Sequence, residues 1–235
     1  MLDVGCGTCA HTVRLATRGA AVHGIDVSFS MLSAGRSAVA ERGLSCRVAL
    51  STSSLRALPF RAGTFDGVLC WGVLMHVPDV AGAIAEIARV VRPGRCVVIS
   101  ESNRRSLQSL ALAGAKRLLR REKADVRRTP GGTGYWVTRQ GGALVTRETD
   151  AGWLVEEFGR RGLRLETRRA GQFSELYTRT GSPAVKALIH RWNRFWFERI
   201  RTPGRRSATS SSSAGRIEPG ARQKMREMAT LRGTR

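Results

Sequence analysis

The sequence predicts an α/β fold: a doubly wound, Rossmann-like and mostly parallel sheet with helices on both faces and lid insertions toward the C-terminus. A first observation is the turn at Gly5 and Gly7, which directly follows the apolar residues 2–4. A second is Asp26, which ends another apolar run about 20 residues further on. A third is the alternation of apolar runs with helix-like segments as far as residue 100. Such alternation indicates βα units around a parallel sheet.

The glycine turn and the acid after the second strand predict a nucleoside site. Gly5 and Gly7 have no Cβ, so their backbone can approach a ligand closely. The carboxylate of Asp26 can accept hydrogen bonds from ribose hydroxyls. An ordinary βα turn with an incidental Asp fits the same residues. So does a nicotinamide or flavin dinucleotide site, because Ala10 completes a G-x-G-x-x-A spacing.

Up to residue 100, the expected elements follow one another closely. Ser28 is expected to cap the second helix, and Pro93-Gly94 to end the third. Trp71 lies at the C-terminal end of the fourth strand and Glu101 directly after the fifth. The expected helices are residues 10–18, 30–42 and 79–91, and the strands after the first are residues 21–25, 46–50, 65–71 and 96–100.

Beyond residue 100 the pattern is looser. We expect a helix capped by Thr149 or Asp150 that runs through Phe158 and stops by Gly162. The other expected elements are a basic amphipathic helix over 103–123, a glycine-rich loop over 129–134, a hairpin over 135–145 with Gly141-Gly142 as its turn, a sixth strand over 163–169 and an aromatic-rich helix over 183–201. No strand is expected after Pro203, so residues 203–235 are predicted to be a disordered basic tail.

Six sequence blocks in order resemble class I S-adenosylmethionine-dependent methyltransferases, in particular the type 11 small-molecule group. The resemblance covers about residues 1–100 and implies S-adenosylmethionine as the methyl donor. It divides the chain into a cofactor-binding core over 1–102, a lid and substrate segment over 103–202, and the tail. The blocks are LDVGCGT at 2–8, GIDVS at 24–28 followed by Met31-Leu32, ALPF at 57–60, FDGVL at 65–69, VLMHVPD at 73–79 and IARVVRPG at 87–94.

The resemblance assigns cofactor contacts residue by residue. Gly5 and Gly7 contact the methionine part through their backbone, and Asp3 orients the turn. Asp26 takes the ribose hydroxyls. The remaining implied cofactor residues are Val27 and Met31 on either side of the adenine, and Ser54, Leu55 and Trp71 around it. In the lid and after the sixth strand, the implied pocket candidates are Tyr135, Trp136, Phe173, Glu175 and Tyr177.

This chain departs from the family pattern at two of these positions. Cys9 stands where the family usually has a third glycine, which narrows the turn. Ser54 stands where the family usually has an Asp for the adenine amino group, so only a weaker, uncharged hydrogen bond is available there, beside the Leu55 amide. Trp71 has three open interpretations: stacking on the cofactor, walling the substrate pocket, or core packing.

Methyl transfer from a sulfonium is an in-line displacement, so the protein mainly binds, orients and dehydrates the reactants. An oxygen acceptor needs a base. His76, at the start of the helix after the fourth strand, is the first candidate, followed by Glu101 and His11. A purely structural role fits His76 equally well, and a carbon or amine acceptor can react without a base. No metal is expected.

The two expected ends depart from the family. The first strand begins at Met1, without the helices that the family carries before it. We therefore expect the true start to lie upstream, with Met1 replacing a Val encoded by GTG. The family also ends its sheet with an antiparallel seventh strand between the fifth and sixth. Because a neighbouring frame over 205–215 can encode an apolar strand, a frameshift is our hypothesis for the tail.

The 235 residues are 42% hydrophobic and 25% charged, as in one globular domain of ordinary size. Of the net charge of +22, +18 lies in residues 101–235. Such charge is compatible with nucleic acid as substrate, but basic clusters such as residues 116–121 are more typical of solvated faces. A small-molecule acceptor is the favoured partner. An RNA methyltransferase and an inactive, truncated relic remain as alternatives.

The cysteines and the hydropathy pattern indicate the cellular environment of the protein. The five cysteines are scattered, so a disulfide framework is not expected, and Cys6-x-x-Cys9 lies inside the glycine turn without a second pair. No apolar run is long enough to span a membrane and no signal-peptide pattern is present. We therefore expect a cytoplasmic protein. The sequence does not indicate its oligomeric state.

Overall fold

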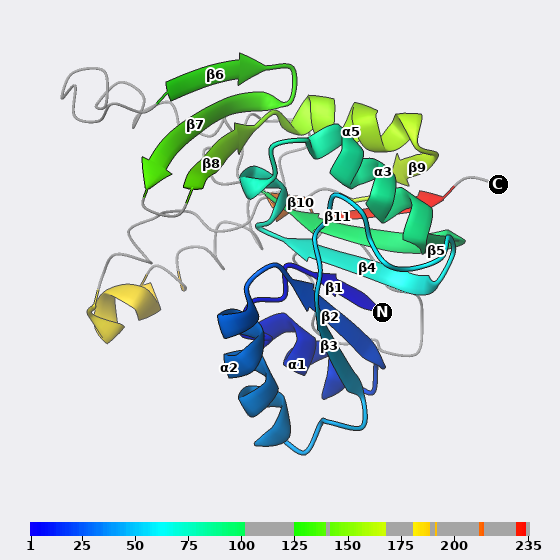
Figure 1. Ribbon diagram of the computed structural model, residues 1–235, viewed down its shortest axis with the longest axis vertical. Coiled ribbons are helices and arrows are strands. Elements are labelled where there is room, and N and C mark those ends of the chain that lie inside the picture. The colour runs from blue at the N-terminus through cyan, green and yellow to red at the C-terminus, as the bar shows by residue number, and fades with distance from the viewer. Residues whose placement is uncertain are drawn as a thin grey trace.

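The computed structural model describes residues 1–101, 125–139, 142–167, 181–188, 191, 212–213 and 229–233 (Figure 1). Its main sheet has the strand order β3-β2-β1-β4-β5-β11-β9, and β10 pairs with β5 beside β11. The strands are β1 Leu2–Val4, β2 Val22–Asp26, β3 Val48–Thr52, β4 Phe65–Trp71, β5 Val91–Ser100, β9 Leu163–Leu165, β10 Ser212–Ser213 and β11 Ala229–Gly233.

The first five strands are parallel, and β11 runs antiparallel to both of its neighbours. The predicted doubly wound, mostly parallel sheet is therefore confirmed. Every helix and strand expected before residue 100 is present, with ends shifted by one or two residues except at β5.

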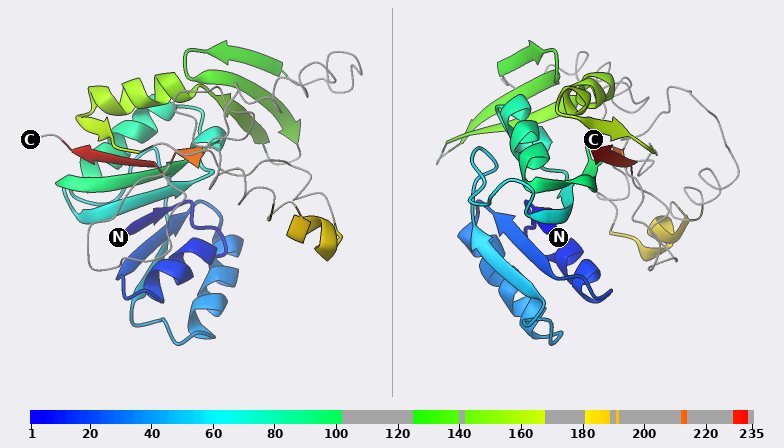
Figure 2. Two further views of the ribbon diagram at one scale, coloured as in Figure 1. Left: turned by 180° about the vertical axis from the view of Figure 1, so that it is seen from behind. Right: turned by 90° about the vertical axis from the view of Figure 1, so that its right-hand side faces the viewer.

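Helices cover both faces of the sheet because adjacent strand residues point to opposite sides (Figure 2). Val68 and Cys70 of β4 lie in the cluster that includes α3 and α5. Leu69, between them, packs with Leu15 of α1 and with Val98 of β5. The helices are α1 Ala10–Ala16, α2 Phe29–Ala40, α3 Val80–Val90 and α5 Ala151–Arg160, and a short 3₁₀ helix, η1, spans Leu74–His76.

Two predicted helix caps are confirmed. The Ser28 hydroxyl accepts a hydrogen bond from the Met31 amide at 3.3 Å. Asp150 Oδ1 accepts from the amides of Gly152 and Trp153 at 2.9 and 3.2 Å. Each side chain satisfies backbone donors that the first turn of a helix leaves unpaired.

The segment after residue 124 folds as a separate antiparallel sheet (Figure 1). It contains β6 Asp125–Thr129, β7 Gly132–Arg139 and β8 Gly142–Thr149. The predicted hairpin is present, but the glycine-rich loop expected over 129–134 is wrong. Gly132 instead pairs with both Thr129 and Thr149, and a Cβ there would collide with the backbone of Glu148. The glycine permits close strand pairing.

The third helix ends just before Pro93-Gly94, where the sequence predicts its end. The helix ends at Val90, and Val91 is already extended and pairs with Phe65. The pairing register then shifts before Gly67 meets Cys96. Pro93 and Gly94, the latter with a φ of 74°, lie in this irregular part of β5. Strand pairing with β4 thus begins directly where the helix stops.

The expectation that no strand follows Pro203 is also wrong. The backbone of β11 fills the position between β5 and β9, with Leu231 opposite Val97 on one side and Leu165 on the other. The physical reason is that β5 and β9 present unpaired backbone groups toward each other. A segment of weak strand propensity can satisfy the groups of both strands. The division of the chain into core, lid and tail stays a prediction.

Several expectations fall only partly on described residues. The sixth strand is described over Leu163–Leu165, and helix is described at 183–188 and 191. The helix expected over 103–123 and the pocket candidates Phe173, Glu175 and Tyr177 lie outside the described residues.

The position of β11 can be tested by proline substitution. Thr230 lies within β11, between two strands, so Thr230→Pro removes a ladder donor there and should lower the free energy of unfolding by about 3 kcal/mol. Thr230→Ala keeps the backbone donor and serves as the matched control. Chemical denaturation of both variants measures the difference. Equal stability of the two variants would contradict a strand at 229–233.

Candidate active site

The glycine turn brings together three segments at the C-terminal edge of the sheet. Gly5 and Gly7 have φ values of 65° and 53°, a region that only glycine adopts freely. A Cβ on Gly5 would collide with the side chain of Val73, which follows β4. A Cβ on Gly7 would lie 3.5 Å from Cε of Met31 on α2. We call this turn the glycine cradle: both positions have the positive φ that favours glycine, and at Gly5 the side chain of Val73 also takes the space that a Cβ would need.

Cys9 takes the place of a glycine at the start of α1. Its φ of 65° makes it the one non-glycine residue with positive φ in the described part of the chain. A side chain in this conformation costs about 1–2 kcal/mol. The Cys9 side chain is fully buried beside Leu32 and Val39 of α2, and its sulfur leaves no room for a Cβ on Gly35. Packing against α2 thus offsets the strained backbone.

Asp26 connects the ends of β1 and β2. Its Oδ2 accepts a hydrogen bond from the Gly7 amide at 2.9 Å, and its Oδ1 accepts from the Ser28 amide at 2.8 Å. The side chain is only half-buried. Because each carboxylate oxygen has two lone pairs, both oxygens can also accept from a ligand. The arrangement fits a ribose with two hydroxyls.

Asp3 lies deeper, within β1. It is 2% exposed, and Thr12 of α1 donates to its Oδ2 at 2.5 Å. Burial raises the pKa of Asp3 to about 6, against the lowering effect of the hydrogen bonds from Thr12. The described contact joins β1 to α1, so Asp3 braces the helix that follows the turn.

Three large apolar side chains beside Asp26 are exposed. Val27 is 71%, Phe29 70% and Met31 43% exposed. Exposed apolar side chains grouped beside a polar group are typical of a ligand surface. Val27 and Met31 are predicted cofactor residues, whereas Phe29 was missed. Its signal in the sequence is an aromatic residue at the first turn of a helix, three residues after the acid.

The predicted adenine loop lies at the same edge. The Ser53 amide donates to the Asp26 carbonyl at 3.0 Å, which places this loop beside the end of β2. Ser54 is exposed, and its Oγ accepts from the Arg56 amide at 3.2 Å. The side chain of Leu55 is buried in the core. Adenine contacts through the Ser54 hydroxyl and the Leu55 backbone stay predictions.

Trp71 stacks on a histidine. Its ring centroid lies 4.6 Å from that of His11, with 28° between the planes. Trp71 also packs against the cluster of Leu69 and Val98. Burial, and then the charge of Arg14, lower the pKa of His11. The sequence did not pair these two rings, which lie on adjacent elements at the edge where the glycine turn opens.

His76 and Glu101, two of the three base candidates, lie on one connected structure. Glu101 is 6% exposed, and its two oxygens accept from the amides of Leu74 and Met75 at 2.7 and 3.0 Å. Burial raises the pKa of Glu101 to about 8, although those amides and the charge of Arg147 lower it. Glu101 therefore holds η1, the turn that carries His76. Nδ1 of His76 lies 3.0 Å from the carbonyl oxygen of Val145.

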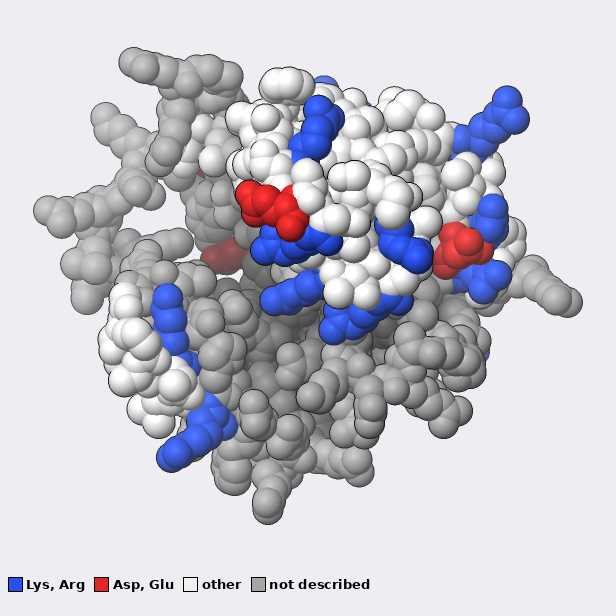
Figure 3. All heavy atoms as spheres, turned by 90° about the horizontal axis from the view of Figure 1, so that it is seen from below, with Lys and Arg blue, Asp and Glu red and all other residues white. Residues whose placement is uncertain are grey.

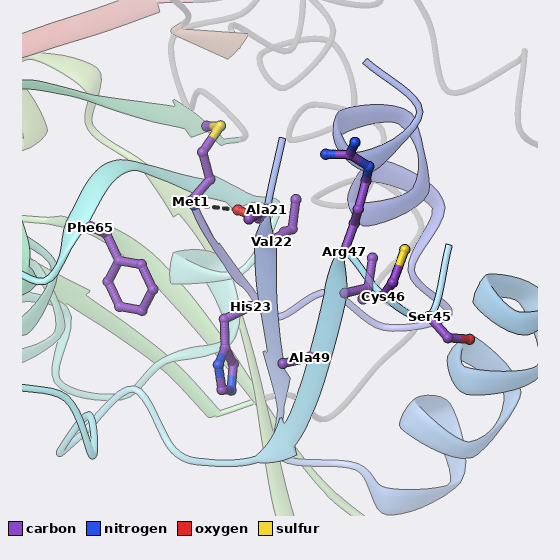
Figure 4. Close-up of a pocket in the computed structure, with 10 residues that line it drawn as sticks. Met1, Ala21, Val22, His23, Ser45, Cys46, Arg47, Ala49 and Phe65 are labelled. Carbon is purple, nitrogen blue, oxygen red and sulfur yellow. Dashed lines mark hydrogen bonds between the residues drawn. The ribbon is translucent and has the colours of Figure 1, made fainter. Parts of the chain in front are cut away.

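A cavity of about 420 Å³ lies at the opposite edge of the sheet (Figure 4). Figure 4 shows His23 and Phe65 on one side of it and Cys46 and Arg47 on the other. These residues belong to the N-terminal ends of β2, β3 and β4 or precede them. The cavity is therefore separate from the glycine turn.

Three further features of the described residues concern surface charge, groups of possible metal ligands and helices able to cross a membrane. Figure 3 shows Lys and Arg side chains spread over the described part of one face, with uncharged surface between them. Some are paired, as Arg92 and Arg95 are with Asp66. Within the described ranges, no group of three His, Cys, Asp or Glu side chains is placed to hold a metal ion. None of the helices in those ranges has the length and apolar character needed to cross a membrane.

A glycine cradle linked to a strand-terminal carboxylate, with exposed apolar side chains beside it, defines a nucleoside-binding α/β domain. Residues 2–99 match the family model described as a methyltransferase domain. This match supports the predicted resemblance of residues 2–99 to class I S-adenosylmethionine-dependent methyltransferases.

Individual relatives agree with this assignment. A ubiquinone biosynthesis O-methyltransferase of Methylococcus capsulatus is 42% identical over 122 residues, which are 51% of this chain and 50% of that protein. The chain thus spans about half the length of the curated relatives that it matches.

Solved structures match the fold. An S-adenosylmethionine-dependent methyltransferase of Methanosarcina mazei superposes with a TM-score of 0.55 at 20% identity, covering 74% of this chain and 84% of that one. Magnesium protoporphyrin IX methyltransferase of Synechocystis, with bound S-adenosylhomocysteine, gives a TM-score of 0.51 at 20% identity, covering 71% and 65%. At these identities the likeness is one of fold.

Loss of the Asp26 carboxylate should weaken binding of the cofactor product. We expect Asp26→Ala to weaken S-adenosylhomocysteine binding by at least about 10-fold, because two ribose hydroxyls would lose a charged acceptor. Isothermal titration calorimetry measures the change. Asp66→Ala, at an exposed Asp beside Arg92, is the matched control. Unchanged affinity in a folded Asp26→Ala variant would remove the ribose role.

Glu101 should make stability fall as pH rises. Its pKa is about 8 in the folded protein against an ordinary value of 4.5, so the folded state holds a proton that the unfolded state has lost. The stability advantage of the wild type over Glu101→Gln should therefore shrink from about pH 5 to 8, by up to about 1.4 kcal/mol per pH unit.

Glu86→Gln is the control for this measurement. Arg89 holds the pKa of Glu86 below its usual range, so Glu86 changes charge below that window. The stability difference between wild type and Glu86→Gln should stay level from about pH 5 to 8. Denaturant unfolding at several pH values measures both. A level difference for Glu101→Gln as well would contradict the raised pKa.

Proposed function

We propose that this chain transfers a methyl group from S-adenosylmethionine to a hydroxyl oxygen of a small-molecule acceptor. The observation that carries the proposal is the cradle at Gly5 and Gly7. The amide of Gly7 is held in place by its hydrogen bond to Asp26. Residues present at this edge fit each part of the cofactor: open backbone for the methionine part, a half-buried carboxylate for the ribose, and exposed apolar side chains for the adenine.

When bound, S-adenosylmethionine supplies a methyl carbon that an acceptor oxygen can attack in line with the breaking carbon–sulfur bond. The chain's own contribution is to hold the acceptor and to remove its proton. The geometry favours His76 for the proton. A carbonyl oxygen only accepts hydrogen bonds, so the contact with Val145 requires the hydrogen on Nδ1, and the neutral ring then has its lone pair on Nε2.

An imidazole base suits a phenolic hydroxyl better than an aliphatic one, because the phenol pKa, about 10, lies much closer to that of histidine. The name of the matched relatives, O-methyltransferases of ubiquinone biosynthesis, supports an oxygen acceptor. We therefore propose phenols and catechols as acceptors. We also propose a cytoplasmic location for the protein.

The chemistry can be tested by supplying labelled S-adenosylmethionine with a panel of phenols, catechols and aliphatic alcohols. Label in the organic extract with phenolic acceptors supports the proposal. Label in total RNA instead would favour the RNA methyltransferase that the positive charge keeps open. A chain that melts cooperatively but binds no S-adenosylhomocysteine would favour the inactive relic.

His76→Gln should reduce kcat by about 100-fold or more with a phenolic acceptor, because a positioned base contributes about 10²–10⁴ in rate. Affinity for S-adenosylhomocysteine should stay within about twofold of wild type, since Asp26 and the glycine turn are untouched. His23→Gln, at the far edge of the sheet, is the matched control. Equal kcat in His76→Gln and wild type would exclude His76 as the base.

A further inference from the structure

The turn over 74–78, which carries His76, is fixed at its start by the sheet. Gly72 donates its amide to the Ser100 carbonyl at 2.7 Å, and the side chain of Val73 lies against Gly5 of the cofactor cradle. The turn itself has little internal bonding: the amides of His76 and Val77 donate to the carbonyls of Val73 and Leu74 at 2.8 and 3.1 Å. A single 3₁₀ turn of this kind needs external support to hold one geometry.

Two buried side chains, the carboxyl group of Glu101 and the guanidinium of Arg147, supply that support. Glu101, at the end of β5, accepts from the amides at the start of the turn. Arg147, on β8 and 5% exposed, donates to carbonyls at its end. Its Nη1 lies 2.7 Å from the Val77 carbonyl and 3.3 Å from that of Leu74, and its Nη2 lies 3.1 Å from the Pro78 carbonyl. The turn is bound at both ends.

The ring of His76 is held by the same strand. Val145, whose carbonyl receives the Nδ1 hydrogen, lies two residues before Arg147 on β8. Any movement of the turn relative to β8 would stretch the bonds from Arg147 and the bond to the imidazole together. The planar guanidinium can donate to several carbonyls at once, which the ammonium group of a lysine cannot do with the same geometry.

We propose that Arg147 is a positioning residue for the base: it fixes the turn over 74–78 against β8, so that the Val145 carbonyl keeps the hydrogen of His76 on Nδ1 and leaves Nε2 to accept the proton. This inference rests on the proposed function. In the reaction the acceptor hydroxyl loses its proton to Nε2 as its oxygen bonds to the methyl carbon, and the electron pair of the carbon–sulfur bond goes to sulfur. Nδ1 keeps its own hydrogen throughout.

The tautomer can be measured without activity. Long-range ¹H–¹⁵N spectra of the full chain at about pH 8, with the His76 signals assigned by loss in His76→Gln, show which ring nitrogen carries the hydrogen. We expect the Nδ1–H tautomer in wild type. An Nε2–H tautomer in wild type would overturn the inference, whatever the activity of the protein.

Arg147→Met tests the positioning role, with Arg127→Met as the matched control at an exposed residue of the same small sheet. We expect mixed tautomers in Arg147→Met and a fall in kcat of about 10–100-fold, with the KM for the acceptor and the affinity for S-adenosylhomocysteine within about twofold of wild type. Arg147→Lys should be intermediate, and Arg127→Met should match wild type. A wild-type tautomer and kcat in a folded Arg147→Met variant would overturn the inference.

Cooperative melting shows which variants fold. If Arg147→Met unfolds, Arg147→Lys provides the same comparison, and if both unfold, the wild-type spectrum decides. A tautomer that changes in Arg147→Met while no acceptor is methylated by the wild type would reject the proposed function and still support the positioning role.

Discussion

The hydrogen bond from the Gly7 amide to Asp26 is the contact on which the candidate site depends. It joins the turn after β1 to the end of β2, beside a second link from the Cys6 amide to the Ile25 carbonyl at 2.9 Å. Because Asp26 also accepts from the Ser28 amide, the same carboxylate fixes where α2 begins. The exposed side chains of that helix, Phe29 and Met31, therefore lie at a defined distance from the glycine cradle.

A second strand-terminal acid repeats this arrangement on the other side of β1. Glu101 follows β5 and accepts from two amides of the turn after β4, as Asp26 follows β2 and accepts from the turn after β1. The two acids differ in exposure: Asp26 is half-buried and can still face a ligand, whereas Glu101 is buried. One acid is thus open to the ligand that we propose, and the other supports the residue that we propose as base.

The meeting of Gly5, Gly7 and Asp26 at one edge of the sheet could be predicted from the sequence because its signals are local. Gly5, Gly7 and Asp26 each follow a short apolar run, and the parallel sheet places such positions at one edge. The position of β11 could not be predicted, because it depends on backbone groups of β5 and β9 far away in the chain. The role of Glu101 was also missed, since only burial and two backbone amides distinguish a supporting carboxylate from a reactive one. Arg147 gave a weak signal, as a charged residue at the same strand face as the apolar Val145.

The support that β8 gives to His76 has a consequence for how the sequence of this hairpin can change. At position 145 the contact with His76 uses only the main-chain carbonyl, while the side chain of Val145 is buried in the core. Position 147 must keep both its arginine and its place in the strand. Insertion or deletion of a single residue within β8 would turn its side chains to the opposite face. A one-residue shift between Val145 and Arg147 would therefore separate the ring contact from the guanidinium contact.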